Sequence, residues 1–103
     1  MILVGRKLLV EFCRQHPHSR KPLAAWEQVI QQTDYWSFNE LKRTFPSADY
    51  VAHRYTIFDI GGNKYRLITE IDYSACVVIV KRIWAHAEYS MKKYEDALKR
   101  GKI

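Results

Sequence analysis

The sequence has little cysteine and no long hydrophobic run, and both absences narrow what the protein can be. Only two cysteines occur in its 103 residues, Cys13 and Cys76, and they lie far apart in unlike contexts. We interpret them as reduced thiols packed in a core, as is typical of a cytoplasmic protein. No apolar run is long enough to span a bilayer. Charged residues interrupt the first segment, MILVGRKLLVEFC, and no small-residue cleavage site follows it, so we do not expect a signal peptide.

The sequence also lacks the spacings that mark several common catalytic and ligand-binding sites. His16 and His18 have no partner at metal-ligand spacing, so we do not expect a zinc site there. The pair Gly61 and Gly62 lacks the strand–loop–helix setting of a nucleotide-binding loop. Spacing supports neither a Ser–His–Asp arrangement nor a pair of catalytic carboxylates.

Positive charge is what the sequence has in excess. The formal net charge is +6 and the sequence pI is about 9.4. Residues 1–44 carry a net charge of +3, residues 45–80 a net charge of −1, and residues 81–103 a net charge of +4. Basic segments on either side of a near-neutral middle favour an anionic partner, and nucleic acid is the usual one for a small protein. The alternative is that surface lysines only keep the protein in solution.

Hydrophobic periodicity predicts helices in the first half of the chain. Residues 1–4 fit a short edge strand, and the apolar residues that follow recur at helical spacing until Pro17, which cannot continue a helix. We expect Ser19 to cap a second helix with one apolar face. The segment SFNELKRTF predicts a third, short helix, with Ser37 as its cap and Glu40 completing a capping box.

The period then changes to that of strands. Three alternating segments rich in β-branched and aromatic residues follow: YVAHRYTIFDI, KYRLITEID and SACVVIVKRIW. The tripeptide GGN predicts a tight hairpin and DYSA a second turn. The tail from His86 to Leu98 returns to helical spacing, with Ala87, Met91 and Tyr94 on its inward stripe together with Leu98.

This order of elements predicts an α+β fold in one domain, residues 1–103. N-terminal helices are expected to pack on a small antiparallel sheet of three or four strands, which a C-terminal helix follows. One face of the sheet is then covered by helices, and the other can stay partly open.

A cluster of positive charge is predicted at one end of the sheet. In the strand KYRLITEID, alternation places Tyr65 and Leu67 toward the core and Lys64 and Arg66 on the opposite face. If the DYSA turn pairs this strand with the next, residues 64–66 lie opposite residues near 80–82, which include Lys81 and Arg82. Gathering like charges costs free energy unless an anion collects there. We therefore predict a phosphate-binding surface.

Two further side chains are expected beside that surface. His86 and Tyr89, with Lys93, share one helical face at positions i, i+3 and i+7. A histidine can act as an acid or base near neutral pH, and a tyrosine can donate a proton or orient a phosphate oxygen. Taken singly, His86 is better interpreted as an ordinary residue at a helix start, and Tyr89 as an amphipathic surface aromatic. His53 is interpreted as a structural residue within a strand.

At this point the sequence resembles a known family. The segments ADYVAHRYTIFDIGGNKYRLITEIDY and VVIVKRIWAHAEYSMKKY are similar to HigB-type toxins of bacterial type II toxin–antitoxin systems, in the RelE-like superfamily. The likeness covers nearly the whole chain, and its most specific parts are FDIGGNKYRLI and the His-x-x-Tyr at 86–89. The resemblance implies a cytoplasmic mRNA interferase that cuts messages in the decoding site of translating ribosomes and needs no metal or other cofactor. It also implies a helix-turn-helix antitoxin of the HigA type.

The resemblance assigns roles to residues by matched position. It implies that Arg66 stabilises charge in the transition state, that Lys81 or Arg82 supports the phosphate, that His86 moves the proton, and that Tyr89 orients or donates. The residues implied in RNA or phosphate contact are Asn63, Lys64, Arg82 and Lys93. One departure is Ala85, where the family often has a threonine, so a helix-capping hydroxyl is lost.

Two other classes of function remain open from the sequence. A non-catalytic module could bind RNA or the ribosome through the same basic surface and arrest translation by occupancy. A protein-interaction domain could carry its positive charge incidentally, and its binding would then not weaken with salt as phosphate contacts do.

Overall fold

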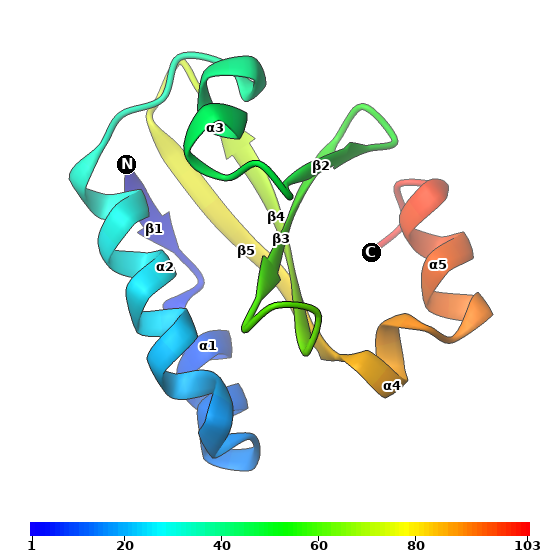
Figure 1. Ribbon diagram of the computed structural model, residues 1–103. Coiled ribbons are helices and arrows are strands. Elements are labelled where there is room, and N and C mark those ends of the chain that lie inside the picture. The colour runs from blue at the N-terminus through cyan, green and yellow to red at the C-terminus, as the bar shows by residue number, and fades with distance from the viewer.

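Five strands form one sheet that lies between two groups of helices (Figure 1). The computed structural model describes all residues, 1–103. The strand order is β1-β5-β4-β3-β2, with bounds β1 (Ile2–Val4), β2 (Asp49–Val51), β3 (Tyr55–Ile60), β4 (Tyr65–Asp72) and β5 (Val77–Ala85). The helices are α1 (Arg6–Gln15), η1 (Pro17–Ser19, a 3₁₀ turn), α2 (Arg20–Gln32), α3 (Phe38–Thr44), α4 (His86–Tyr89) and α5 (Lys92–Lys99). The predicted α+β class is confirmed, and no helix is both long enough and apolar enough to cross a membrane.

The sheet is mixed rather than purely antiparallel. The predicted edge strand at residues 1–4 is confirmed as β1, but it pairs with β5 in parallel, with Ile2 opposite Val77. All other pairs in the sheet are antiparallel. A parallel pair needs a long crossover connection, here residues 5–76, so local sequence carries no signal for the partner of so short a strand.

The caps of α2 and α3 differ from each other. Ser37 caps α3 as predicted, because its Oγ accepts a hydrogen bond of 3.2 Å from the Glu40 amide. The Glu40 carboxylate accepts from the amide of Trp36 instead of closing the expected box on Ser37. Ser19 occupies the predicted cap position of α2, but it makes no capping bond, because its buried hydroxyl donates to the His16 carbonyl at 2.7 Å. The turn η1 runs directly into α2, so Ser19 precedes α2 with a helical backbone.

The segment expected as one strand at residues 50–60 is divided into β2 and β3. A turn at residues 52–54 separates them, and Ala52 and His53 both have left-handed backbones, with φ of 58° and 51°. The expectation that His53 lies in a strand is therefore wrong, and its side chain is exposed. Non-glycine residues seldom adopt this conformation, so alternation alone could not reveal the turn.

The β4–β5 register also differs from the expected one. Arg66 lies opposite Trp84, whereas Lys81 and Arg82 lie further along, opposite the irregularity between Ile68 and Thr69. Two features explain the difference. The turn comprises residues 73–76, whereas the expected DYSA turn is residues 72–75, and a β-bulge adds one unpaired residue to β5. The expected clustering of Lys81 and Arg82 with residues 64–66 is thus wrong.

The predicted helix at residues 86–98 is broken in two. Between α4 and α5, Ser90 leaves the helical pattern and its hydroxyl donates to the His86 carbonyl at 2.6 Å. Such a side-chain bond competes with the backbone ladder of a helix. Tyr94 and Leu98 pack inward as expected, but Ala87 and Met91 are exposed.

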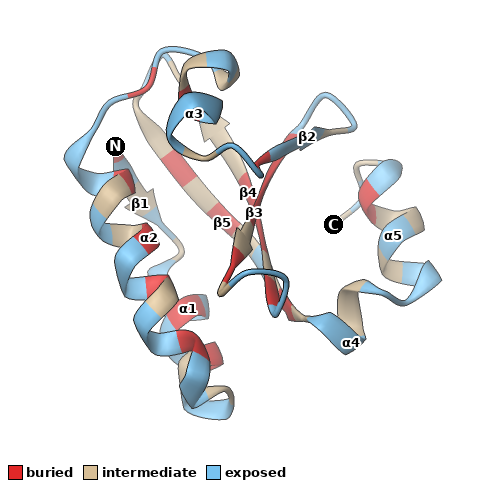
Figure 2. Cartoon of the chain, viewed as in Figure 1, coloured by how far each residue is buried: buried red, intermediate tan, exposed pale blue.

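Two hydrophobic clusters lie on the two faces of the sheet (Figure 2). The larger one contains 15 buried residues beneath α1, α2 and α3, and the smaller one contains 5 between the sheet and α5. Strand β4 contributes to both because its side chains alternate: Tyr65 and Leu67 enter the larger cluster and Ile68 the smaller one. Arg66 therefore faces the thinly covered side.

Candidate active site

Arg66 stands at the centre of the candidate site, on the face of β4 that turns away from the N-terminal helices. Its guanidinium carbon lies 4.3 Å from the centroid of the Tyr89 ring, a cation–π contact. Its Nε lies 3.7 Å from Oδ1 of Asp59, and the two side chains are 33% and 23% exposed. This Nε is buried and has no hydrogen-bond partner. The cation is therefore held between a ring and a carboxylate.

The short helix α4 is pinned to the β3–β4 hairpin. Strand β5 runs directly into α4, and the His86 amide donates to the Lys64 carbonyl at 3.0 Å. The Tyr89 hydroxyl donates to the Asn63 carbonyl at 2.6 Å. The hairpin owes its shape to Gly61 and Gly62, whose φ values of 64° and 72° favour glycine. Asn63 and Lys64 thus position α4 through their carbonyls, while their side chains stay exposed.

His86 and Tyr89 are brought together as the spacing predicts. Their ring centroids are 4.8 Å apart, and the exposed imidazole of His86 has its Nδ1 3.4 Å from Oγ of Ser90. The Ser90 hydroxyl hydrogen is already engaged with the His86 carbonyl. In that weak contact Nδ1 can therefore be the donor, which leaves Nε2 free to exchange a proton with a bound molecule.

Three of the predicted site residues lie outside the cluster formed by Arg66, His86 and Tyr89: they are Lys81, Arg82 and Lys93. Arg82 donates to the carbonyl of Lys81 at 2.6 Å and lines a small groove beside α1. Lys93 lies on α5, where its ammonium is 5.1 Å from the Tyr94 ring centroid, because the break before α5 separates it from the face of His86 and Tyr89. No hydrogen bond, ion pair or ring contact joins these three side chains to Arg66.

Sequence reasoning missed Asp59, which lies directly opposite Arg66 in the β3–β4 ladder. The signal was available, because Asp59 and Arg66 stand at matching distances on either side of the hairpin loop at 61–64. Burial raises the pKa of the Asp59 carboxyl, and the neighbouring Arg66 charge opposes that rise. A partly buried carboxylate beside the central arginine is therefore part of the site.

A second carboxylate, that of Glu95 on α5, also interacts electrostatically with Arg66. The pKa of Glu95 is lowered mainly by its hydrogen bond of 2.8 Å from Lys99, with a smaller effect from the Arg66 charge. Glu95 is 53% exposed and already paired. No group of three or more His, Cys, Asp or Glu side chains lies in a position to hold a metal ion.

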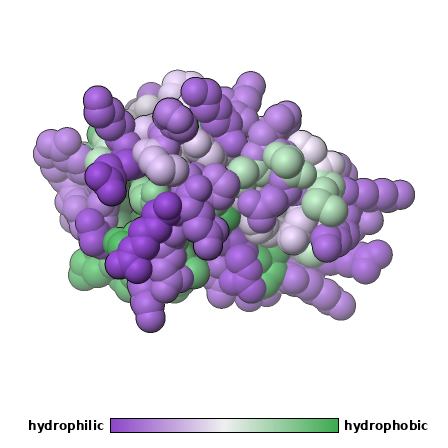
Figure 3. All heavy atoms as spheres, turned by 90° about the horizontal axis from the view of Figure 1, so that it is seen from below, coloured by the Kyte–Doolittle hydropathy of each residue, from purple (hydrophilic) through white to green (hydrophobic).

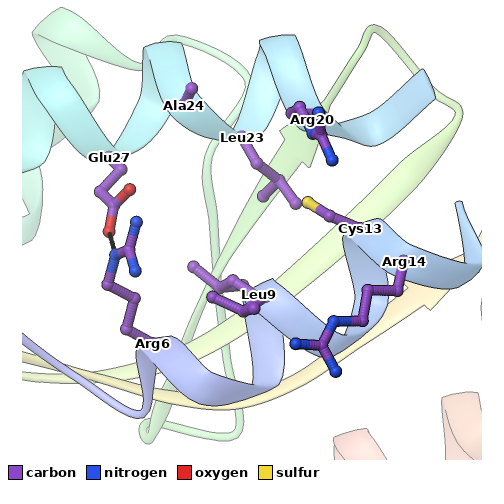
Figure 4. Close-up of a pocket in the computed structure, with 9 residues that line it drawn as sticks. Arg6, Leu9, Cys13, Arg14, Arg20, Leu23, Ala24 and Glu27 are labelled. Atoms are coloured by element: carbon purple, nitrogen blue, oxygen red, sulfur yellow. Dashed lines mark hydrogen bonds and ion pairs between the residues drawn. The ribbon is translucent and has the colours of Figure 1, made fainter. Parts of the chain in front are cut away.

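The largest groove of the molecule lies elsewhere, between α1 and α2 (Figure 4). Its volume is about 240 Å³, an Arg6–Glu27 ion pair crosses it, and Cys13 on α1 points toward Leu23 on α2. None of the candidate residues lines it. The candidate site is instead an open surface, and the molecule seen from below is mostly hydrophilic, with hydrophobic atoms gathered toward the N-terminal helices (Figure 3).

Comparison with known proteins gives two matches. Residues 19–92 match the sequence model of a family described as HigB_toxin, the RelE-like toxic component of a toxin–antitoxin system. A protein called mRNA interferase HigB, from Escherichia coli O6:H1, is 31% identical over 91 residues, which cover 86% of this chain and 88% of the relative. The residues matched to the family include the hairpin, Asp59, Arg66 and all of α4.

Proposed function

Because this chain belongs to the HigB family of RelE-like toxins, we propose that it is an mRNA endoribonuclease that cuts messages on the translating ribosome. The name of the Escherichia coli relative, an mRNA interferase, supports the class of reaction. The observation that carries the proposal is the placement of the Arg66 guanidinium against Tyr89, whose ring in turn contacts His86. A cation and an imidazole, a side chain able to accept and donate protons, are thus held on one open surface, where RNA can reach them.

The proposed reaction is an internal attack within the RNA. The 2′-hydroxyl loses its proton and its oxygen bonds to the adjacent phosphorus, while the bond from phosphorus to the 5′-oxygen breaks and that oxygen takes up a proton. The products are a 2′,3′-cyclic phosphate and a 5′-hydroxyl. In this scheme His86 moves the proton, and Arg66 stabilises the added negative charge on the crowded phosphate.

The other predicted residues take supporting roles in the proposal. Tyr89 orients the Arg66 guanidinium through its ring, and its hydroxyl would have to leave the Asn63 carbonyl before it could donate to a phosphate oxygen. Lys64, exposed beside the hairpin, is proposed to contact the RNA backbone with the side chain of Asn63. Lys81, Arg82 and Lys93 lie outside the cluster, so we assign them to longer-range attraction of mRNA and ribosomal RNA. The nucleophile is part of the substrate and the charges come from side chains, so the scheme uses no metal or cofactor.

A second part of the proposal concerns the partner. The family description names a toxin–antitoxin system, so an antitoxin is expected. We propose a helix-turn-helix antitoxin of the HigA type, which would bind the toxin in the cytoplasm and keep it from the ribosome. It would also repress the operon that encodes toxin and antitoxin. Residues 1–44 and 81–103 carry net charges of +3 and +4, which supports a partner with an acidic surface.

Mapping new 5′ ends in a translating extract tests the proposal. Arg66→Ala should lower cleavage by about a hundredfold or more, as expected for loss of a preorganised group facing the developing charge. Its co-sedimentation with ribosomes should be largely unchanged. Arg43→Ala, which removes the same charge from an exposed position on α3, serves as the matched control and should cleave normally. Arrest of translation by the unmodified protein without new 5′ ends would show occupancy rather than catalysis.

A further inference from the structure

We propose that Asp59 is a positioning residue, whose carboxylate holds the Arg66 guanidinium against Tyr89 and turned toward the substrate phosphate. The inference rests on the proposed function, since it assigns a role beside the residue proposed to stabilise the transition state. Two observations carry it: Asp59 is the direct partner of Arg66 in the β3–β4 ladder, and its Oδ1 lies 3.7 Å from the Arg66 Nε.

The backbone brings this pair together. Ile60 and Tyr65 close the hairpin, and Asp59 and Arg66 form the next pair. Side chains directly opposite each other in an antiparallel pair lie on the same face, with Cβ atoms about 5 Å apart. The glycine-containing loop fixes this register, so the backbone of the hairpin places Asp59 next to Arg66.

Asp59 and Tyr89 together hold the guanidinium from two directions. The ring lies 4.3 Å from the guanidinium carbon, and the carboxylate lies on the side of Nε. At 3.7 Å the carboxylate attracts the charge but makes no hydrogen bond, and the buried Nε has no other partner. No protein group accepts a hydrogen bond from the guanidinium, so both Nη groups remain free to grip two phosphate oxygens.

A carboxylate beside a phosphate-binding arginine should weaken RNA binding, because the two anions repel each other. A residue that served only the stability of the fold would show no particular relation to the reaction. A positioning residue should instead give a split result: its removal lowers the rate of the chemical step without weakening the binding of RNA. This split is what separates the proposal from a purely structural role.

Glu95 provides the matched control. It is the other carboxylate that influences Arg66, but it lies on α5, is 53% exposed and is hydrogen-bonded to Lys99. Glu95→Gln therefore removes the same charge from the same region without freeing the arginine. A change seen with Asp59→Asn and absent with Glu95→Gln reports on positioning and not on overall charge.

The kinetic test uses the full chain on ribosomes programmed with a defined message. Asp59→Asn should lower kcat about fivefold, with KM unchanged or lower, while Glu95→Gln behaves as the unmodified protein. In the Arg66→Ala background, Asp59→Asn should have no further effect, because its action runs through the arginine. The proposal is overturned if Asp59→Asn keeps full kcat, if it raises KM instead, or if it still slows the Arg66→Ala variant.

A second measurement does not depend on activity. NMR signals of arginine Nε–H groups report exchange with water, and the buried Nε–H of Arg66 should exchange slowly in the unmodified protein. Asp59→Asn should speed that exchange and Glu95→Gln should not; equal exchange in all three proteins overturns the positioning role. If the unmodified protein cleaves no RNA, the proposed function fails, and this measurement still decides whether Asp59 holds Arg66.

Discussion

The two faces of the sheet use the same strands for different purposes. Beneath α1, α2 and α3 the face is apolar, with 15 buried residues in one cluster. The face toward α4 and α5 has only 5, and it also carries Arg66, Asp59 and the ring of Tyr89. Figure 2 shows this contrast in the helices, since α1 and α2 carry several buried positions and α4 and α5 are mostly exposed or intermediate.

The difference shows where charged groups can reside in so small a fold. Full burial of a charge carries a large desolvation cost. A helix pair that covers its face only in part leaves Arg66 33% exposed and Asp59 23% exposed, so both keep some contact with water. The fully covered face supplies the stability that lets the other face hold a charged site.

The largest expected effect on stability comes from the covered face. Leu67 is 0% exposed, and Leu67→Ala should lower the free energy of unfolding by about 3 kcal/mol through lost burial and a residual cavity. Its neighbour provides the control: Arg66→Ala removes a partly exposed side chain and should change stability by about 1 kcal/mol or less. Urea unfolding at neutral pH measures both. Equal losses would contradict the assignment of different purposes to the two faces.

A smaller effect is expected from the open face. Tyr89→Phe keeps the ring under Arg66 but removes the hydroxyl that donates to the Asn63 carbonyl, which should cost about 1 kcal/mol of stability. Cleavage should fall severalfold, because α4 is less firmly attached to the hairpin. Tyr89→Ala removes both contacts and should lower cleavage further. If the two variants cleave equally, the ring does not orient Arg66 as proposed.

Local chemistry explains which parts of the fold could be predicted. The GGN hairpin is confirmed because two glycines supply the left-handed backbone that the loop requires. The alternation of β4 is confirmed because Tyr65 and Leu67 enter the covered cluster while Arg66 faces the other side. Ser37 is confirmed as a cap because its interaction spans only three residues.

The features that sequence could not predict depend on distant contacts or on irregular backbone. The parallel partner of β1 follows it only after residues 5–76, so the pairing depends on contacts distant in sequence. The bulge opposite Ile68 and Thr69 shifts Lys81 and Arg82 away from the hairpin, and no residue in VVIVKRIW signals it. The break at Ser90 likewise removes Lys93 from the face of His86 and Tyr89.

For the site, the sequence predicted that Arg66, His86 and Tyr89 lie together, but it did not predict Asp59 beside Arg66. Arg66, His86 and Tyr89 lie within one connected set of contacts, and their catalytic roles stay predictions. Asp59 is a single acidic residue in the apolar strand β3, and the excess of positive charge in the sequence gives no sign of it. Counting outward from the hairpin loop would have placed it opposite Arg66, since register near a tight turn is set by the turn.

A further comparison concerns the cap of α4. Ala85 has the extended backbone of a cap residue but no side-chain acceptor, although Glu88 already accepts from its amide at 3.2 Å. Ala85→Thr should therefore complete a capping box and raise the free energy of unfolding by about 1 kcal/mol. Ala87→Thr, on an exposed position within the same helix, is the control and should be slightly destabilising. A gain with both variants would point to a cause other than capping.

The smallest expected effects are those of pH on two aspartates with opposite shifts. Hydrogen bonds from the Ser74 hydroxyl and the Ala75 amide lower the pKa of Asp72, so its contribution to stability is present at neutral pH and is lost as pH falls from about 4 toward that lowered value. Burial raises the pKa of Asp59, so the folded state holds the proton more tightly and stability declines as pH rises from about 4 through the raised value. At neutral pH, urea unfolding should show Asp72→Asn to be less stable than the unmodified protein and Asp59→Asn to be at least as stable, with both differences shrinking in acid. A loss of stability in Asp59→Asn at neutral pH would mean that its attraction to Arg66 outweighs the cost of burying its charge.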